Sequence, residues 1–308
     1  MLQLGQVLRG RLGSYVLSSR LQDTVWKATH QRLGTPVIVK NAPEWRIRNE
    51  RDMLLRFQDR GPFRRLLDEV VVGKNSESAL VLRYLDSDIL RVCDRRRLTT
   101  HEYKSVAKTV LLALDRLHQE GFIHTDIKPN NILVNLDAKG CITDVQLADL
   151  EATMHQNREM AMSGTPVGTP IFRSPEATLG ISWKQSTDLW SFGTTLISLI
   201  YGDGIHIFLP DVPVDHDEYT LRILKRHYEY FGPFPETYLE IATGDQIGVL
   251  TWIMKNTPVE AKRPFRLVDP QELAVEDRDF LLKIMKLDPR DRPTARELLK
   301  DEWFASSP

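Results

Sequence analysis

The segment FIHTDIKPNNILVN, residues 122–135, combines three side chains that together could carry out phosphoryl transfer. Asp126 offers a carboxylate that could orient an attacking hydroxyl group. Lys128 offers a cation for the migrating phosphoryl group, and Asn131 offers a neutral oxygen ligand for Mg²⁺. All three fall within six positions of a predicted loop, so one short stretch of chain carries the residue types that this chemistry needs.

Short β-rich runs dominate the chain up to about residue 85. They cover residues 15–18, 24–28, 36–40, 70–72 and 79–84. One helix should interrupt them, because Pro43 suits a first helical turn and the apolar residues that follow, up to Phe57, recur at helical spacing. These runs predict a small β-rich lobe.

Beyond residue 90 the apolar pattern becomes helical. Capping boxes at Thr99 with Glu102 and at Thr294 with Glu297 should each open a helix, and Gly121 should end the first of them. A third helix should carry the apolar run 189–201, with Ser186 or Thr187 as its cap. We expect an α+β, bilobal fold in one domain, 1–308, with an N-lobe at about 1–85, a hinge at about 83–88 and a mostly helical C-lobe at 89–308.

Composition limits the partners and the compartment. The net charge of −1 indicates neither a broad surface for binding nucleic acid nor a strongly cationic surface for binding a membrane. No run reaches the roughly 18 apolar residues of a membrane span, and the N-terminus lacks a secretory apolar segment. Cys93 and Cys141, the only cysteines, lack metal-ligand spacing. We therefore expect an intracellular protein of the cytoplasm or the nucleus; its oligomeric state stays open.

Several further motifs follow in order, and together they resemble the eukaryotic protein kinase family over nearly the whole chain. Lys40, which ends TPVIVK, resembles the lysine that holds the α- and β-phosphates of ATP. Glu50 in NERDML is the candidate for its partner glutamate. Asp149 in LADLEA takes the place of the aspartate that binds Mg²⁺. The segment GTPVGTPIFRSPEA, residues 164–177, resembles the end of an activation segment, with Thr169 in the substrate-docking loop.

Three charged residues look architectural by the same resemblance. Glu176 should pair with Arg292, and Asp188 in STDLWSFG should be buried and anchor the backbone of the catalytic loop. The pattern DxKxxN and Thr169 resemble the serine/threonine branch. Other stretches resemble the cyclin-dependent and SR-protein kinase branch and divergent fungal kinases that read HTDIKPNNIL followed by ADLE.

The resemblance implies ATP and Mg²⁺ as cofactors and a serine or threonine hydroxyl of a protein as substrate. It assigns catalysis to Asp126 and Lys128, and the metal to Asn131 and Asp149. The nucleotide-binding residues that it implies are Lys40, Glu50, Ile38, Val25, Leu82, Arg83, Tyr84, Leu85 and Leu133.

Four departures stand against this pattern. The segment YVLSSRLQDTVWKA, residues 15–28, has no GxGxxG and too few residues for a full glycine-rich loop; Gly10 and Gly13 should be turn residues before the first strand. Ile38 replaces an alanine beside the adenine. Thr125 replaces the arginine that would receive an activation-segment phosphate. Glu151 replaces a glycine, which should make the loop less free to change conformation.

These departures leave two alternatives to an active protein kinase. One is a pseudokinase that acts as a binding scaffold. The other, which we expect less, is a small-molecule phosphotransferase of the aminoglycoside or choline type. Against the last, Lys128 and the residues 164–177 resemble parts of a peptide-docking surface.

Overall fold

The computed structural model describes residues 2–57, 59, 62–72 and 77–305, and its contacts divide the chain into two compact units. The first unit comprises Met1–Asp88 and Asn131–Thr153, and the second comprises Ile89–Asn130 and Met154–Pro308. The segment Asn131–Thr153 thus groups with the β-rich unit, although it follows the predicted hinge in the sequence.

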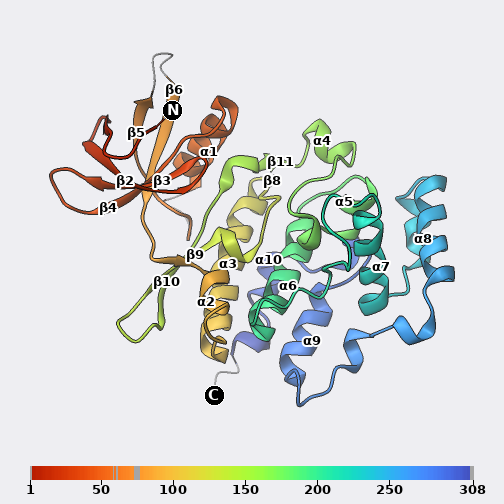
Figure 1. The fold of residues 1–308 in the computed structure, drawn as a ribbon. Coiled ribbons are helices and arrows are strands. Elements are labelled where there is room, and N and C mark those ends of the chain that lie inside the picture. Colours follow the sequence, from red (N-terminus) through yellow and green to blue (C-terminus); the bar gives the residue numbers. More distant parts are fainter. Residues whose placement is uncertain (1, 58, 60–61, 73–76, 306–308) are drawn as a thin grey trace. The chain divides into compact units, whose positions relative to one another are not determined.

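An antiparallel sheet of six strands, in the order β1-β2-β3-β4-β6-β5, forms most of the first unit (Figure 1). Its strands are β1 (Val7–Arg9), β2 (Ser14–Gln22), β3 (Val25–His30), β4 (Pro36–Lys40), β5 (Leu66–Val72) and β6 (Glu77–Arg83). All five predicted strands are present, and β1 is an addition. The helix α1 (Glu44–Phe57) begins directly after Pro43, as predicted, and contacts β5 and β6.

Alternation along the strands separates the two faces of this sheet. Val37 and Val39 of β4 belong to the buried cluster that fills one side of the sheet, together with Trp26 and Ala28 of β3. Ile38 and Lys40 must therefore face the other side. This alternation is what brings a charged lysine to the face where the candidate site is assembled.

Gly10 and Gly13 lie between β1 and β2, not before the first strand, because the short strand β1 precedes them. Gly10 bridges to Val70, so that the edge strands β1 and β5 meet. The Asp68 carboxylate accepts hydrogen bonds from the amides of Arg11 and Leu12, at 3.1 and 2.8 Å. A Cβ at Gly10 would approach Asp68 Oδ2 to 2.2 Å, which explains the glycine there.

A smaller antiparallel sheet, in the order β10-β9-β7, completes the first unit. It consists of β7 (Ser87–Asp88), β9 (Ile132–Leu136) and β10 (Ile142–Leu147). The 3₁₀ turn η2 (Leu150–Ala152) follows β10 and contacts α1 extensively.

Helices dominate the second unit (Figure 1). They are α2 (Ile89–Cys93), α3 (Thr100–Gln119), α4 (Glu159–Met162), α5 (Pro175–Leu179), α6 (Ser186–Tyr201), α7 (Tyr219–Phe231), α8 (Gly244–Asn256), α9 (Val275–Ile284) and α10 (Ala295–Leu298), with 3₁₀ turns η3 (Pro170–Phe172), η4 (Glu236–Glu240), η5 (Val259–Ala261), η6 (Phe265–Leu267), η7 (Pro289–Asp291) and η8 (Glu302–Phe304). The pair β8 (Phe122–Ile123) and β11 (Met154–His155) forms a two-stranded sheet, and η1 (Pro129–Asn131) joins the units in sequence.

Both predicted capping boxes are present, at Thr99 with Glu102 and at Thr294 with Glu297. The predicted cap of α6 is wrong. Gln185 occupies the N-cap position and makes no side-chain cap, while the Thr187 hydroxyl is 2.6 Å from that of Ser174. Thr187 is buried, so a tertiary partner takes the hydroxyl that local spacing assigned to the helix end.

The buried helix α6 contacts α3 and α9 and forms the centre of the second unit. His227 of α7 packs against it, with its ring 4.8 Å from the Trp190 ring and 4.5 Å from that of Phe208. Among the described residues, neither nitrogen of His227 has a hydrogen-bond partner. No described helix has both the length and the apolar character needed to cross a membrane.

The buried His227 predicts an acid-sensitive stability. Burial, helped by the charge of Arg292, lowers the pKa of His227 to about 3. The unfolded chain therefore binds a proton below pH 6.5 that the folded chain does not, and stability falls as the pH drops from 6.5 towards 3. Between pH 7 and pH 5 the free energy of unfolding should fall by about 2 kcal/mol. Only the range below pH 6.5 contributes, at about 1.4 kcal/mol per pH unit.

Chemical unfolding at the two pH values checks this. His227→Phe should show a loss of stability on acidification that is smaller than that of the wild type by about 2 kcal/mol. The exposed His101 gives the matched control, since His101→Gln should keep the wild-type difference. An unchanged pH dependence in His227→Phe would contradict the assignment.

Candidate functional site

Three carboxylates surround the ammonium of Lys40 in the first unit. Lys40 Nζ lies 2.7 Å from Glu50 Oε2, 2.6 Å from Asp149 Oδ1 and 3.0 Å from Glu151 Oε2. The side chains of Lys40 and Glu50 are 11% and 1% exposed. The structure thus brings together three residues that the sequence predicts for the site, and it adds Glu151.

Opposite charges make this burial possible. Burial alone would lower the pKa of Lys40, but the carboxylates of Glu50, Asp149 and Glu151 outweigh it and raise that pKa above its ordinary value. Burial raises the pKa of Glu50, an effect that Lys40 opposes. The ammonium therefore stays charged at neutral pH and holds the carboxylates close to one another.

Helical spacing places Glu50 in the interior. On α1 it lies three residues after Ile47 and four before Leu54, and all three are buried. Residues at this spacing share one face of a helix. The apolar face of α1 therefore carries the glutamate to the sheet, where Lys40 at the end of β4 meets it.

Strand register places the other nucleotide-binding residues predicted in the sheet on the same face as Lys40. Val25 pairs with Lys40, and Ile38 pairs with Leu82, so all four side chains share one face. Lys27, which pairs with Ile38, lies on this face too; sequence analysis missed it, although a period of two from Val25 would have found it.

The predicted hinge follows β6. The Lys27 ammonium lies 4.5 Å from the centre of the Tyr84 ring, and Leu85 is buried. The Arg83 amide donates to the Arg65 carbonyl, and the Arg83 side chain pairs with Asp144 at 2.8 Å. The amide and the side chain of Arg83 are therefore already engaged.

The paired strands β9 and β10 bring the two predicted metal ligands near each other. Asn131 precedes β9, and its carbonyl accepts a hydrogen bond of 2.9 Å from the amide of Ala148, the residue before Asp149. Asp149 has φ 66° and ψ 60°, a left-handed conformation. Leu133 lies on β9, opposite Gln146 and Asp88. Carboxylate and amide oxygens are ligands that suit Mg²⁺.

The missing glycine-rich loop is replaced by a tight hairpin. Strands β2 and β3 pair up to Gln22 and Val25, which leaves only Asp23 and Thr24 for the turn. The exposed side chains of Arg20 and Asp23 form an ion pair of 2.8 Å. Most backbone amides here thus belong to a strand ladder.

Asp126 and Lys128 come together in the second unit. Asp126 Oδ2 lies 2.7 Å from Lys128 Nζ, while Asp126 Oδ1 accepts hydrogen bonds from the Thr169 amide and hydroxyl, at 3.0 and 2.8 Å. Lys128 Nζ also donates to the Thr169 hydroxyl at 2.9 Å. Burial opposes ionisation, but Lys128 and the hydrogen bonds outweigh it and lower the pKa of Asp126. The carboxylate is therefore ionised at neutral pH.

The buried Asp188 fixes the backbone just before Asp126, as predicted. Its carboxylate accepts hydrogen bonds from the amides of His124 and Thr125, at 2.8 and 2.9 Å, and lies 2.9 Å from His118 Nε2. Thr125 has a φ of 73°. A Cβ at Gly168 would lie 2.3 Å from the Thr125 carbonyl oxygen, so only glycine permits this close approach of the Thr169 segment.

Glu176 and Arg292 form the predicted buried pair. Two parallel contacts of 2.7 and 2.8 Å join them, and neither side chain is exposed. Arg173, which sequence analysis gave no role, donates from Nε to the Val167 carbonyl and from Nη2 to that of Gly168. Arg173 thus fixes the backbone just before Thr169, and Arg292 fixes Glu176, which follows Thr169 in the sequence.

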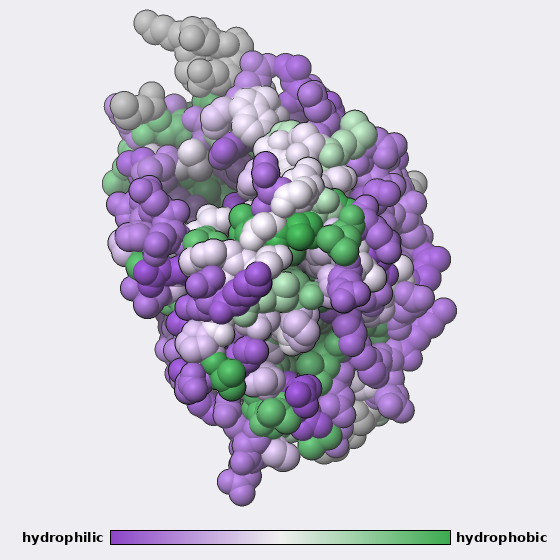
Figure 2. All heavy atoms as spheres, turned by 90° about the vertical axis from the view of Figure 1, so that its right-hand side faces the viewer, coloured by the Kyte–Doolittle hydropathy of each residue, from purple (hydrophilic) through white to green (hydrophobic). Residues whose placement is uncertain are grey.

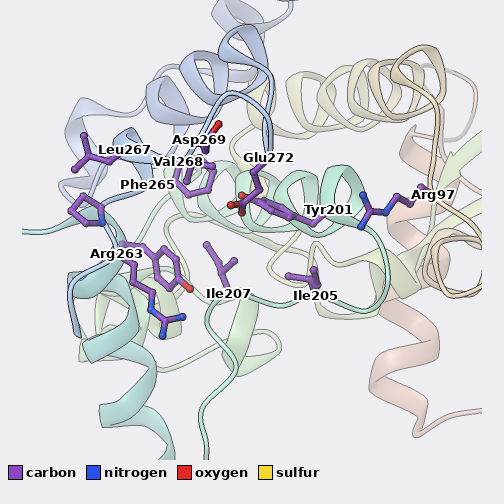
Figure 3. Close-up of a pocket in the computed structure, with 12 residues that line it drawn as sticks. Arg97, Tyr201, Ile205, Ile207, Arg263, Phe265, Leu267, Val268, Asp269 and Glu272 are labelled. Atoms are coloured by element: carbon purple, nitrogen blue, oxygen red, sulfur yellow. The ribbon is translucent and has the colours of Figure 1, made fainter. Parts of the chain in front are cut away.

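A separate cavity of about 600 Å³ lies in the second unit (Figure 3). Apolar side chains line it, with Arg97 and Arg263 at its two ends and Glu272 beside Tyr201. Burial and a hydrogen bond to Glu272 raise the pKa of Tyr201. None of the residues predicted for phosphoryl transfer lines this cavity.

On the face seen in Figure 2, apolar residues form small groups among hydrophilic ones.

Sequence comparison identifies relatives of the chain. The protein kinase domain family matches residues 24–304. The mitogen-activated protein kinase pmk-1 of Caenorhabditis elegans is 29% identical over 296 residues, which cover 92% of this chain and 73% of that protein. The mitogen-activated protein kinase kinase kinase 2 of Arabidopsis thaliana is 31% identical over 203 residues, 64% of this chain but only 24% of that protein.

A further relative and a solved structure are also similar to this chain. The serine/threonine-protein kinase STE20 of Saccharomyces cerevisiae is 25% identical over 256 residues, 78% of this chain and 22% of that protein. A chain in the crystal structure of the yeast RNA Pol II CTD kinase CTDK-1 complex superposes with a TM-score of 0.79 at 18% identity, over 96% of this chain and 93% of its own length, which shows a shared fold. The chain therefore belongs to the eukaryotic protein kinase family, whose fold it has and whose serine/threonine members it resembles in sequence.

Proposed function

We propose that this chain is an ATP-dependent serine/threonine protein kinase that transfers the γ-phosphoryl group of ATP to a hydroxyl of a protein. The observation that carries the proposal is the ion pair of 2.7 Å between Lys40 and Glu50, with Asp149 2.6 Å from the same ammonium. In this family that pair must be in place for turnover.

Each group then has a role in the transfer. Lys40 binds the α- and β-phosphates, held in position by Glu50. The ionised Asp126 orients the substrate hydroxyl and takes its proton as the oxygen forms a bond to the γ-phosphorus and the bond to ADP breaks. Lys128 stabilises the charge of the migrating phosphoryl group. Asn131 and Asp149 would hold Mg²⁺, which would supply positive charge to neutralise the phosphates of ATP.

A pseudokinase is the main alternative. The hairpin at Asp23 and Thr24 and the bulky Ile38 favour weak nucleotide binding. Against a pseudokinase, all the charged groups of the transfer are present, and Asp126 is ionised at neutral pH, so its carboxylate can accept a hydrogen bond from a substrate hydroxyl.

A protein substrate is favoured over a small molecule. Thr169 is bonded to both Asp126 and Lys128, and Arg173 orders the backbone just before Thr169. Such an ordered segment beside the catalytic carboxylate suits an extended peptide. We further propose that the protein acts inside the cell, in the cytoplasm or the nucleus.

Removal of the Asp126 carboxylate should abolish transfer. Because positioned proton acceptors contribute about 10² to 10⁴ in rate, Asp126→Asn should lower phosphorylation by at least about a hundredfold. Radiolabelled ATP with basic or arginine- and serine-rich protein substrates measures this. Equal labelling by the wild type and Asp126→Asn would contradict the proposal, as would an absence of both labelling and ATP-dependent thermal stabilisation in the wild type.

Thr169 should be needed for turnover, whereas Ser163 and Thr165 should not. Thr169→Ala removes two hydrogen bonds to charged groups and should lower kcat by about tenfold or more, while Thr169→Ser keeps the hydroxyl and most of the activity. Ser163 and Thr165 are exposed, and their hydroxyls are 3.0 Å apart. Position 125 carries no arginine for a phosphate, so the double variant Ser163→Ala/Thr165→Ala should retain wild-type turnover. Loss of activity in that double variant would show that a phosphate there is required.

A further inference from the structure

Glu151 links β4 to α1 through its two carboxylate oxygens. Oε2 lies 3.0 Å from Lys40 Nζ, and Oε1 lies 3.2 Å from Nη1 of Arg46 on α1. The side chains of Glu151 and Lys40 are 18% and 11% exposed, whereas that of Arg46 is 47% exposed, so water screens the contact with Arg46 more than the contact with Lys40. A glycine, the residue that the family resemblance leads us to expect here, could make neither contact.

The backbone around Glu151 is held by the same helix. Asn49 Nδ2 donates to the carbonyl oxygens of Glu151 and Thr153, at 2.8 and 2.9 Å. Asn49 and Glu50 lie three and four residues after Arg46, so both lie beside Arg46 on one side of α1. On this helix, therefore, Glu50 contacts Lys40, Asn49 contacts the backbone of Glu151, and Arg46 contacts the carboxylate of Glu151.

The three acidic side chains do not form an empty cation site. Ligand oxygens of Glu50, Asp149 and Glu151 lie within 4.8 Å of one another. The Lys40 ammonium is 2.6–3.0 Å from each of them and already occupies the space that they enclose. The ammonium donates a hydrogen bond to Asp149, and its contacts with Glu50 and Glu151 are ion pairs. The arrangement therefore orients Lys40 and does not select a metal ion.

The sequence lacks one common means of ordering such a site. Thr125 stands where an arginine would receive an activation-segment phosphate, and Thr125 offers no charge to a phosphate. Something else must keep α1 and Asp149 in place if the enzyme works without that phosphate. Glu151 contacts both Lys40 and Arg46 of α1, and so adds a second link to the direct Lys40–Glu50 pair.

We propose that Glu151 is a positioning residue: by bridging Lys40 and Arg46 it holds α1 and the Asp149 segment in the nucleotide-binding arrangement without any phosphate on the activation segment. This inference rests on the proposed kinase function. Loss of the bridge lowers the population of the competent arrangement, and saturating nucleotide restores it, so the effect falls on KM for ATP more than on kcat.

Steady-state kinetics of unphosphorylated protein, verified by intact mass, test the proposal. Glu151→Gln is isosteric and neutral, and Glu151→Gly restores the family residue. Both should raise KM for ATP by about tenfold while kcat changes less than about threefold. Arg46→Ala should also raise KM, but should add little to Glu151→Gln, because the two residues share one contact. Arg48, on the same helix, pairs with the exposed Glu44, and Arg48→Ala is the matched control.

Hydrogen exchange of the nucleotide-free protein gives a second readout. Amides of α1 should exchange at least about fivefold faster in Glu151→Gln than in the wild type or in Arg48→Ala. A lower KM in Glu151→Gln would show that Glu151 competes with the nucleotide for Lys40 and would overturn the proposal. Unchanged KM and unchanged exchange would overturn it as well.

The exchange experiment also separates this proposal from the proposed function. If the wild type transfers no phosphate, the kinase function fails, whereas faster exchange of α1 in Glu151→Gln would still establish the bridge. Active wild-type protein with an unaltered Glu151→Gln variant would refute the bridge and leave the kinase function standing.

Discussion

A buried ammonium is the constraint on which the first unit depends. Lys40 is 11% exposed on the face of a sheet, where an unpaired charge would be strongly unfavourable. Removing one partner of a buried pair typically costs about 3–5 kcal/mol. Glu50 of α1 and Asp149 and Glu151 after β10 supply the compensating charge. The register of β4, the rotation of α1 and the course of residues 149–153 must therefore agree with one another.

The second unit uses buried charges in the same way. Asp188 holds the backbone before Asp126, and the Glu176–Arg292 pair, with neither side chain exposed, ties the segment after Thr169 to the C-terminal part of the chain. These residues touch no reacting group in the proposed transfer. Their contacts fix the backbone around Asp126, and a backbone fixed in advance reduces the ordering that catalysis would otherwise require.

Sequence reasoning succeeded where local spacing determines structure. Both capping boxes and the start of α1 were predicted, because each depends on a short motif. The Lys40–Glu50 and Glu176–Arg292 pairs were expected from the family resemblance and not from spacing. Sequence reasoning failed where a distant partner decides. Three residues of β1 gave no periodic signal, Thr187 bonds Ser174 instead of capping α6, and Lys27 reaches the candidate site only through the pairing of β3 with β4. The bridge from Glu151 to Arg46 spans 105 positions, and no local pattern could have indicated it.

The central claim is that the assembled Lys40 cluster gives this chain nucleotide affinity although a hairpin replaces the glycine-rich loop. Calorimetric titration of the wild type and of Lys40→Met with ATP and Mg²⁺ tests it most directly. The account predicts saturable binding by the wild type and binding at least about tenfold weaker, or 1.4 kcal/mol, in the variant. Absence of binding by the folded wild type, or equal affinity of the two proteins, would contradict it.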